Sequence, residues 1–182
     1  EVLRAWHQWG WQEMYDLHGA DSIRLAQAYD LVFHEVLPGA VGELSDVHYH
    51  PTSPTLDPSS GDEHAWDIWF GLEDFEYYSR NSGRFVSEFG LQSLPNKHTL
   101  AEAGISAFED EALQFRQRSK MEWLEPGFDG WDMMLHFMTK TTGAPAPSNL
   151  DDWIFRSQAT QAEGLRRALE RHRTSRGRYA GS

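Results

Sequence analysis

Short apolar segments alternate with helical patterns along this chain, and this alternation limits the folds that it can adopt. Three segments, near residues 47–50, 62–67 and 84–88, have the length and side chains of short strands. The third is closed by Gly90. Strands that alternate with helices favour an α/β fold built on a parallel sheet. We therefore expect three parallel, adjacent strands with helices on one side of them.

The remaining segments have helical periodicity. They are residues 3–15, a helix from Asp21 that Pro38-Gly39 should stop, residues 109–123, residues 131–141, and a long helix after Asn149. Asn149 is expected to cap the last helix. Asp152 follows in its first turn and arginines gather near its C-terminus, where the helix dipole favours each charge.

Length and composition limit the classes of protein to which this chain can belong. A chain of 182 residues is enough for one domain with a sizeable core, but a complete (β/α)8 barrel takes about 250 residues. A net charge of −12 argues against nucleic-acid and anionic-membrane partners. No apolar run approaches the roughly 18–20 residues that span a bilayer. The absence of cysteine excludes disulfides and favours a cytoplasmic location, with periplasmic, secreted and lysosomal locations left open.

Aromatic residues make up 13% of the chain, with eight Trp, six Tyr and ten Phe. Trp is costly to bury unless its N–H finds a partner. Trp residues near acidic and His side chains therefore suggest a cleft in which rings stack on sugars. A Trp-rich core or a protein interface is the alternative.

Glu88 lies at the end of an apolar strand, just before a glycine, within the stretch Arg84-Phe85-Val86-Ser87-Glu88-Phe89-Gly90. In a parallel barrel the C-terminal ends of the strands form the rim that carries the active site. A carboxylate on such a rigid strand end is well placed as a nucleophile or a base. The alternative is an exposed glutamate that pairs with Arg84.

Residues 84–95, Arg-Phe-Val-Ser-Glu-Phe-Gly-Leu-Gln-Ser-Leu-Pro, resemble the nucleophile strand of β-mannosidases of glycoside hydrolase family 2. Residues 61–71 resemble the preceding strand, and Trp9-Gly10-Trp11 resembles a helix of the same enzymes. The resemblance implies that residues 1–182 are a segment of one catalytic domain, a partial (β/α)8 TIM barrel. The segment would run from strand four to the helix before strand eight.

The resemblance implies two catalytic carboxylates. Glu88 matches the nucleophile, and Glu1 matches the acid/base residue because Trp9-Gly10-Trp11 follows it at the family's distance. The two Asn that precede the acid/base residue in the family are absent, so an arbitrary chain start is the alternative for Glu1. A retaining glycosidase holds its two carboxyl groups about 5–5.5 Å apart.

Other residues are expected to bind the sugar. Asp62, His64 and Trp66 alternate along one strand and so share one face, where they would bond to and stack on the substrate. Their alternative is a half-buried strand in which His pairs with Asp. Trp9 and Trp69 are candidate stacking platforms or core residues. Arg84 is expected beside Glu88, where its charge favours the ionised nucleophile, and Phe70 replaces a Tyr whose hydroxyl contacts the nucleophile in many relatives.

The implied activity is that of a retaining exo-β-mannosidase that removes terminal β-D-mannose. Its partners would be a β-mannoside and the remainder of the parent catalytic domain. A β-galactosidase, β-glucuronidase or β-glucosaminidase of the same family is an alternative, and so is a non-catalytic carbohydrate-binding module. The family chemistry needs no metal or other cofactor. A three-histidine metal site of His48, His50 and His64 is a minor alternative.

Overall fold

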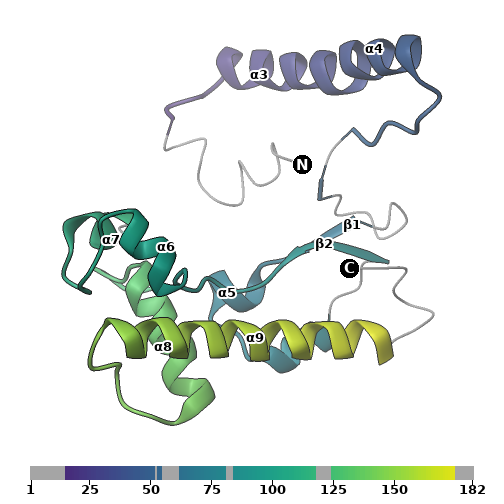
Figure 1. Cartoon of the computed structure of the whole chain (residues 1–182). Helices are drawn as coiled ribbons and strands as arrows, with labels where there is room; N and C mark the ends of the chain where they lie inside the picture. The colour runs from purple at the N-terminus through teal and green to yellow at the C-terminus, as the bar shows by residue number, and fades with distance from the viewer. Residues whose placement is uncertain (1–14, 52, 55–61, 81–83, 118–123, 175–182) are drawn as a thin grey trace. The chain divides into compact units, whose positions relative to one another are not determined.

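A computed structural model divides the chain into two compact units, Glu1–His64 and Ala65–Ser182. The structure describes residues 15–51, 53–54, 62–80, 84–117 and 124–174 (Figure 1). The expected helix at residues 3–15 therefore lies almost wholly outside the described residues.

The first unit contains one continuous helical run. It consists of α3 (Ala20–Asp30), a π-helical turn η1 (Leu31–Val36) and α4 (Leu37–Leu44) (Figure 1). The prediction that Pro38-Gly39 stops this helix is wrong. Pro38 lies in the first turn of α4, directly after η1, where a missing backbone N–H is tolerated.

The expected strand at residues 47–50 is not formed. Residues 45–50 have no regular secondary structure. The Val47 N–H donates to Oγ of Ser45 (3.1 Å), and the Val47 side chain is 71% exposed. A local hydrogen bond of this kind offers the backbone an alternative to a strand ladder.

The other two expected strands form, although the first ends at Ala65 instead of residue 67. They are β1 (Asp62–Ala65), which crosses from the first unit into the second, and β2 (Phe85–Phe89). Together they form a two-stranded sheet, the only one among the described residues. The described part of the chain thus mixes helices with strands, but its sheet has two strands instead of the three expected.

Helices make up most of the second unit. They are α5 (Asp67–Gly71), the 3-10 helix η2 (Phe75–Ser79), α6 (Lys97–Glu102), α7 (Glu111–Arg116), α8 (Gly130–Thr142) and α9 (Leu150–Thr174). The prediction at residues 131–141 is confirmed as α8. The expected cap of α9 is also confirmed, because Oδ1 of Asn149 accepts from the Asp152 N–H (3.0 Å). The helix expected at residues 109–123 is shorter, and residues 118–123 lie outside the described ranges.

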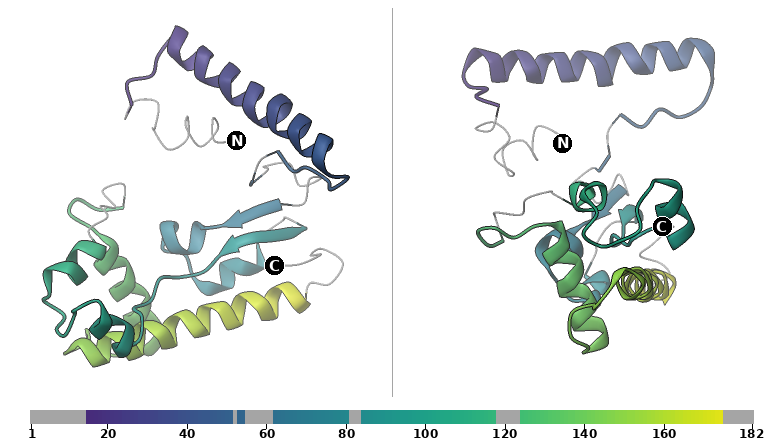
Figure 2. Two further views of the ribbon diagram at one scale, coloured as in Figure 1. Left: turned by 45° about the horizontal axis from the view of Figure 1, so that its top comes forward. Right: turned by 60° about the vertical axis from the view of Figure 1, so that its left-hand side comes forward.

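The core of the second unit joins these helices to β2. Phe137 of α8 stacks on Trp69 and on Phe75, with ring centroids 5.5 and 5.9 Å apart. Val86 of β2 and Tyr78 of η2 are fully buried in the same cluster. Figure 2 shows α9 running alongside β2 in this unit. None of the described helices has both the length and the apolar character needed to cross a bilayer.

Candidate active site

Glu88 lies at the end of β2, as predicted, with an exposed side chain. Gly90 follows with φ of +139°, a conformation that residues with a Cβ rarely adopt. A Cβ on Gly90 would also contact Cδ2 of Leu165 on α9, at 3.6 Å. Gly90 therefore lets the chain leave the strand close to α9, two residues after the candidate nucleophile.

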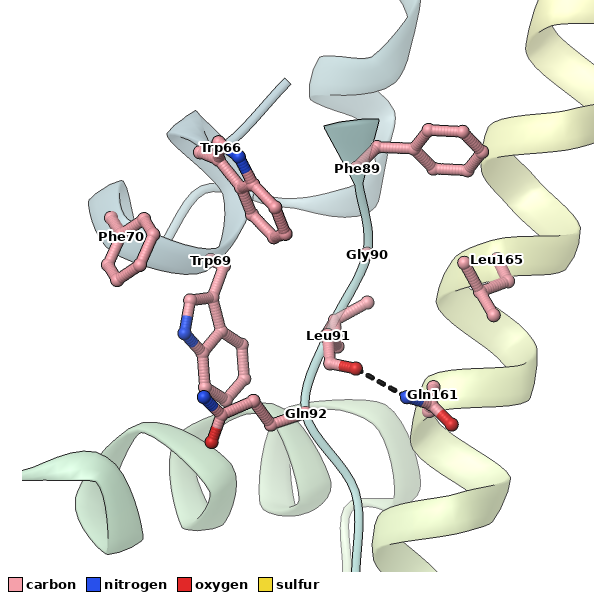
Figure 3. A pocket seen from close by; sticks show the side chains of 9 residues that line it. All are labelled: Trp66, Trp69, Phe70, Phe89, Gly90, Leu91, Gln92, Gln161 and Leu165. Carbon is pink, nitrogen blue, oxygen red and sulfur yellow. Dashed lines mark hydrogen bonds between the residues drawn. The ribbon is translucent and has the colours of Figure 1, made fainter. Parts of the chain in front are cut away.

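The segment after Gly90 is held by side chains of α9. Gln161 donates to the carbonyl of Leu91 (2.5 Å), as Figure 3 shows, and Gln158 donates to the carbonyl of Leu94 (3.0 Å). The Leu94 N–H donates to the buried Oγ of Ser157 (3.0 Å). These bonds satisfy backbone groups that have no strand partner there. They tie the exit of β2 to a rigid 25-residue helix.

The end of β2 meets the end of β1 through a hydrogen bond. Nε1 of Trp66 donates to Oε2 of Glu88, with 2.9 Å between the two atoms. Trp66 directly follows β1 and is the N-cap residue of α5, so its indole extends from a fixed backbone position. The structure therefore brings together two residues that the sequence placed on separate strands.

A pocket of about 290 Å³ adjoins this hydrogen bond, and Trp66 forms part of its wall (Figure 3). Its lining residues are mostly apolar: Trp66, Trp69, Phe70, Phe89, Gly90, Leu91, Gln92, Gln161 and Leu165. Trp69 is 2% exposed and stacks on Phe137, so it serves the core as well as the pocket. Phe70 is 41% exposed and meets Trp66 edge to face.

An aromatic cluster lies behind the end of β2. Phe89 packs edge to face against His172 of α9, with centroids 5.3 Å apart, and Tyr78 contacts both rings. Burial lowers the pKa of His172 and raises the pKa of Tyr78 to about 12. Both groups therefore favour their neutral forms.

The other expected sugar-binding residues that the structure describes do not line this pocket. Asp62, 9% exposed, lies 3.7 Å from Nε2 of His50, and His64 hydrogen-bonds to Ser53 (2.9 Å). Asp62 therefore lies beside a histidine, but this histidine is His50 and not His64, the histidine of the expected strand. Arg84 is exposed and directly precedes β2. The sugar-binding roles of all these residues stay predictions.

Two expected site residues, Glu1 and Trp9, lie outside the described residues. Among the described residues, His48, His50 and His64 included, no three His, Cys, Asp or Glu side chains are grouped so that they could hold a metal ion.

Sequence reasoning missed the polar residues of α9 that hold the β2 exit. The apolar residues of that helix form a stripe, and Ser157, Gln158 and Gln161 interrupt it. The stripe consists of Leu150, Trp153, Ile154, Ala162, Leu165 and Leu169. Buried or half-buried polar residues in such a stripe normally have a hydrogen-bond partner. This interruption was the signal that could have identified them.

Comparison with known proteins links the chain to β-mannosidases, although no protein-family model matches it. A protein named Beta-mannosidase B from Neosartorya fischeri is 36% identical over 143 residues, and its namesake from Aspergillus clavatus is 30% identical over the same length. Each alignment covers 74% of this chain and 16% of the relative. The chain therefore spans about a sixth of the length of these relatives.

A solved structure gives the same link. The crystal structure of a beta-D-mannosidase from Dictyoglomus thermophilum matches with a TM-score of 0.61 and 25% identity. The match covers 84% of this chain and 19% of that one. Sequence and structure thus agree, and the resemblance to β-mannosidases inferred from the motifs around Glu88 is confirmed.

Proposed function

We propose that the chain is part of the catalytic domain of a retaining exo-β-mannosidase of glycoside hydrolase family 2. Residues 1–182 would form a partial (β/α)8 barrel, completed by the remainder of the parent domain. The observation that carries the proposal is Glu88, a carboxylate at a strand end, hydrogen-bonded to Trp66 in a segment that matches named β-mannosidases. The proposed substrate is a glycoside with a terminal β-D-mannose.

In the first step, an oxygen of Glu88 attacks the anomeric carbon of the mannose. The bond from that carbon to the leaving-group oxygen breaks, and Glu1 gives this oxygen a proton. The product is a mannosyl ester of Glu88. In the second step, Glu1 takes a proton from water, the water oxygen attacks the anomeric carbon, and Glu88 leaves as a carboxylate. Two inversions at one carbon retain its configuration.

The half-buried Trp66 and the pocket beside it support a role in sugar recognition. Indole rings offer flat apolar faces together with a polar N–H, which suits the mixed surface of a sugar. We assign the same role to Trp9, Asp62, His64 and Trp69, and we assign to Arg84 the role of favouring the ionised nucleophile.

Covalent trapping tests the nucleophile. The full-length protein is treated with 2-deoxy-2-fluoro-β-mannosyl fluoride, digested, and mapped by mass spectrometry. We expect the label on Glu88, no label in Glu88→Gln, and normal labelling in Glu73→Gln, which changes an exposed glutamate of the same unit. A label on another residue would overturn the assignment of Glu88. Absence of both label and hydrolysis of aryl β-mannosides would overturn the enzymatic proposal.

The apolar pocket lined by Trp66, Trp69 and Phe70 favours a second candidate, a non-catalytic carbohydrate-binding module. Such a module would bind mannosides and show no covalent label. A panel of aryl β-glycosides separates the remaining alternatives, because a galactosidase, glucuronidase or glucosaminidase would prefer its own sugar over mannose.

A further inference from the structure

We propose that Trp66 is a positioning residue for Glu88, whose Nε1–H fixes the carboxylate for attack and stabilises it when it leaves the sugar. The inference rests on the proposed function, since it assigns Trp66 a role in the second step of that reaction. It differs from a sugar-stacking role, because the group that acts is the indole N–H and not the ring face.

The hydrogen bond is geometrically sound. The 2.9 Å distance from Nε1 of Trp66 to Oε2 of Glu88 is typical of N–H···O bonds. An indole has this one donor and no acceptor, so the bond has a single possible direction. The Glu88 side chain has three rotatable torsions. Holding one of its oxygens restricts the plane of the carboxylate and presents the other oxygen to the anomeric carbon.

The backbone and the packing around Trp66 hold its indole N–H in a fixed position. The Trp66 carbonyl accepts from the Phe70 N–H (2.8 Å), which closes the first turn of α5. Two residues of that turn, Ile68 and Trp69, are 1% and 2% exposed and anchor it in the core. The Phe70 ring packs against the indole at a centroid distance of 5.9 Å. The donor is therefore in place before any substrate binds, as preorganised stabilisation requires.

The hydrogen bond from Trp66 should accelerate the second step in particular, because Glu88 regains its negative charge in that step. In the mannosyl ester, the oxygen held by Trp66 is a neutral carbonyl oxygen. As water attacks, the bond from the anomeric carbon to Glu88 breaks and its electron pair returns to the carboxylate. Hydrogen bonds to ionised acceptors are roughly twice as strong as neutral ones, so the bond to Trp66 strengthens during this step. Only interactions that strengthen toward the transition state accelerate a step.

Two substitutions separate the donor from the ring. Trp66→Phe keeps an aromatic ring and removes the N–H. Trp66→His keeps a donor, because Nε2 of an imidazole occupies the place of Nε1 in the five-membered ring of an indole. Trp153→Phe is the control, since Trp153 is a buried tryptophan of the same unit that stacks on Phe108 and does not line the pocket. Each variant is made in the full-length protein and checked for folding by circular dichroism.

The readout is turnover of 2,4-dinitrophenyl β-mannoside, a substrate whose leaving group needs little protonation. For Trp66→Phe we expect about a 10-fold lower kcat together with a lower KM, because slow release of Glu88 lets the mannosyl ester accumulate. Stopped-flow mixing should show a burst of dinitrophenol. Trp66→His should recover kcat to within about 3-fold of the unchanged protein, as retention of the donor requires, and Trp153→Phe should show no new burst.

A raised KM with unchanged kcat in Trp66→Phe would show that Trp66 acts only as a sugar contact, and it would overturn the positioning role. Equal losses of kcat in the Phe and His variants would overturn it as well, because the donor would then not matter. These outcomes are distinct from failure of the proposed function. In that case the unchanged protein would itself give no turnover and no covalent label on Glu88.

Discussion

Gly164 of α9 packs directly against Leu91, the second residue after β2. A Cβ added at Gly164 would overlap Cδ1 of Leu91 and would lie 3.3 Å from the ring of Phe75. Leu91 is buried and its carbonyl is bonded to Gln161 of the same helix, so it has little room to move. The absence of a side chain at Gly164 thus sets how closely α9 approaches the exit of β2.

Gly164→Ala should therefore destabilise the second unit, although alanine is the better helix former. Helix propensity favours the alanine by about 1 kcal/mol, whereas forcing an extra methyl group into a packed core costs about 1–3 kcal/mol. We expect a net loss of about 1 kcal/mol in the free energy of unfolding, measured with urea. Gly39→Ala in α4, where a Cβ meets nothing within 4 Å, should be neutral or stabilising. Equal effects of the two substitutions would contradict this packing argument.

The strand-end position of Glu88 could be predicted because it depends on local sequence alone. An apolar segment followed by glycine marks the end of a strand, and Asn149 before an acidic turn marks the start of a helix. Both predictions are confirmed. The helical run through Pro38 could not be predicted, because it depends on the π-helical turn that precedes α4. Sequence patterns give no clear sign of such a turn.

Side-chain partners at the site were harder to predict than secondary structure. The alternation of Asp62, His64 and Trp66 suggested one strand face, but β1 ends at Ala65 and Trp66 begins a helix. Its indole consequently contacts Glu88, 22 residues away. Asp62 likewise lies next to His50, a residue that the sequence placed on a different strand. Such contacts depend on tertiary packing, which overrides local pattern.

Ser157→Ala should destabilise the second unit by about 1–2 kcal/mol. The substitution removes the acceptor of the Leu94 N–H and leaves that donor buried without its bond. Thermal or urea unfolding followed by circular dichroism measures the loss. Ser148→Ala, at an exposed position before α9, should change stability by less than about 0.5 kcal/mol. If Ser157→Ala unfolds like the unchanged protein, the hydrogen bond does not hold the β2 exit.

Acid should weaken the protein partly through Glu163. Hydrogen bonds from Arg166 and Arg167 lower the pKa of the Glu163 carboxyl from its usual 4.5 to about 2. The folded state therefore favours the ionised form, and the resulting stability is complete above pH 4.5 and is lost as the pH falls toward 2. Because Glu163 is partly exposed to solvent, we expect its ionised form to contribute only about 0.5–1 kcal/mol to the free energy of unfolding.

The check is a series of urea unfolding curves between pH 5 and pH 2.5. Glu163→Gln should give a shallower decline of stability with acid than the unchanged protein. Glu125→Gln, which changes an exposed glutamate in a turn, should leave the decline as it is. A Glu163→Gln curve parallel to that of the unchanged protein would mean that the arginine pair contributes nothing measurable.

The roles of the two carboxylates lead to opposite behaviour in mutants of the full-length protein. Glu88→Gln should abolish turnover of aryl β-mannosides and leave mannoside binding largely intact, because glutamine keeps the shape of the side chain but cannot form the mannosyl ester. Isothermal titration measures the binding. Near-normal turnover in Glu88→Gln would show that Glu88 is not the nucleophile.

Glu1→Ala should fail at the second step instead. A good leaving group needs little protonation, so the mannosyl ester still forms on Glu88, but no base is left to activate water. Azide is a nucleophile that needs no base, and in the cavity left by the carboxylate it should attack the ester and restore turnover. Because the sugar is inverted twice, the product should be β-mannosyl azide, which NMR distinguishes from the α-anomer. An α-anomer, or no rescue by azide at any concentration, would rule out the acid/base role of Glu1.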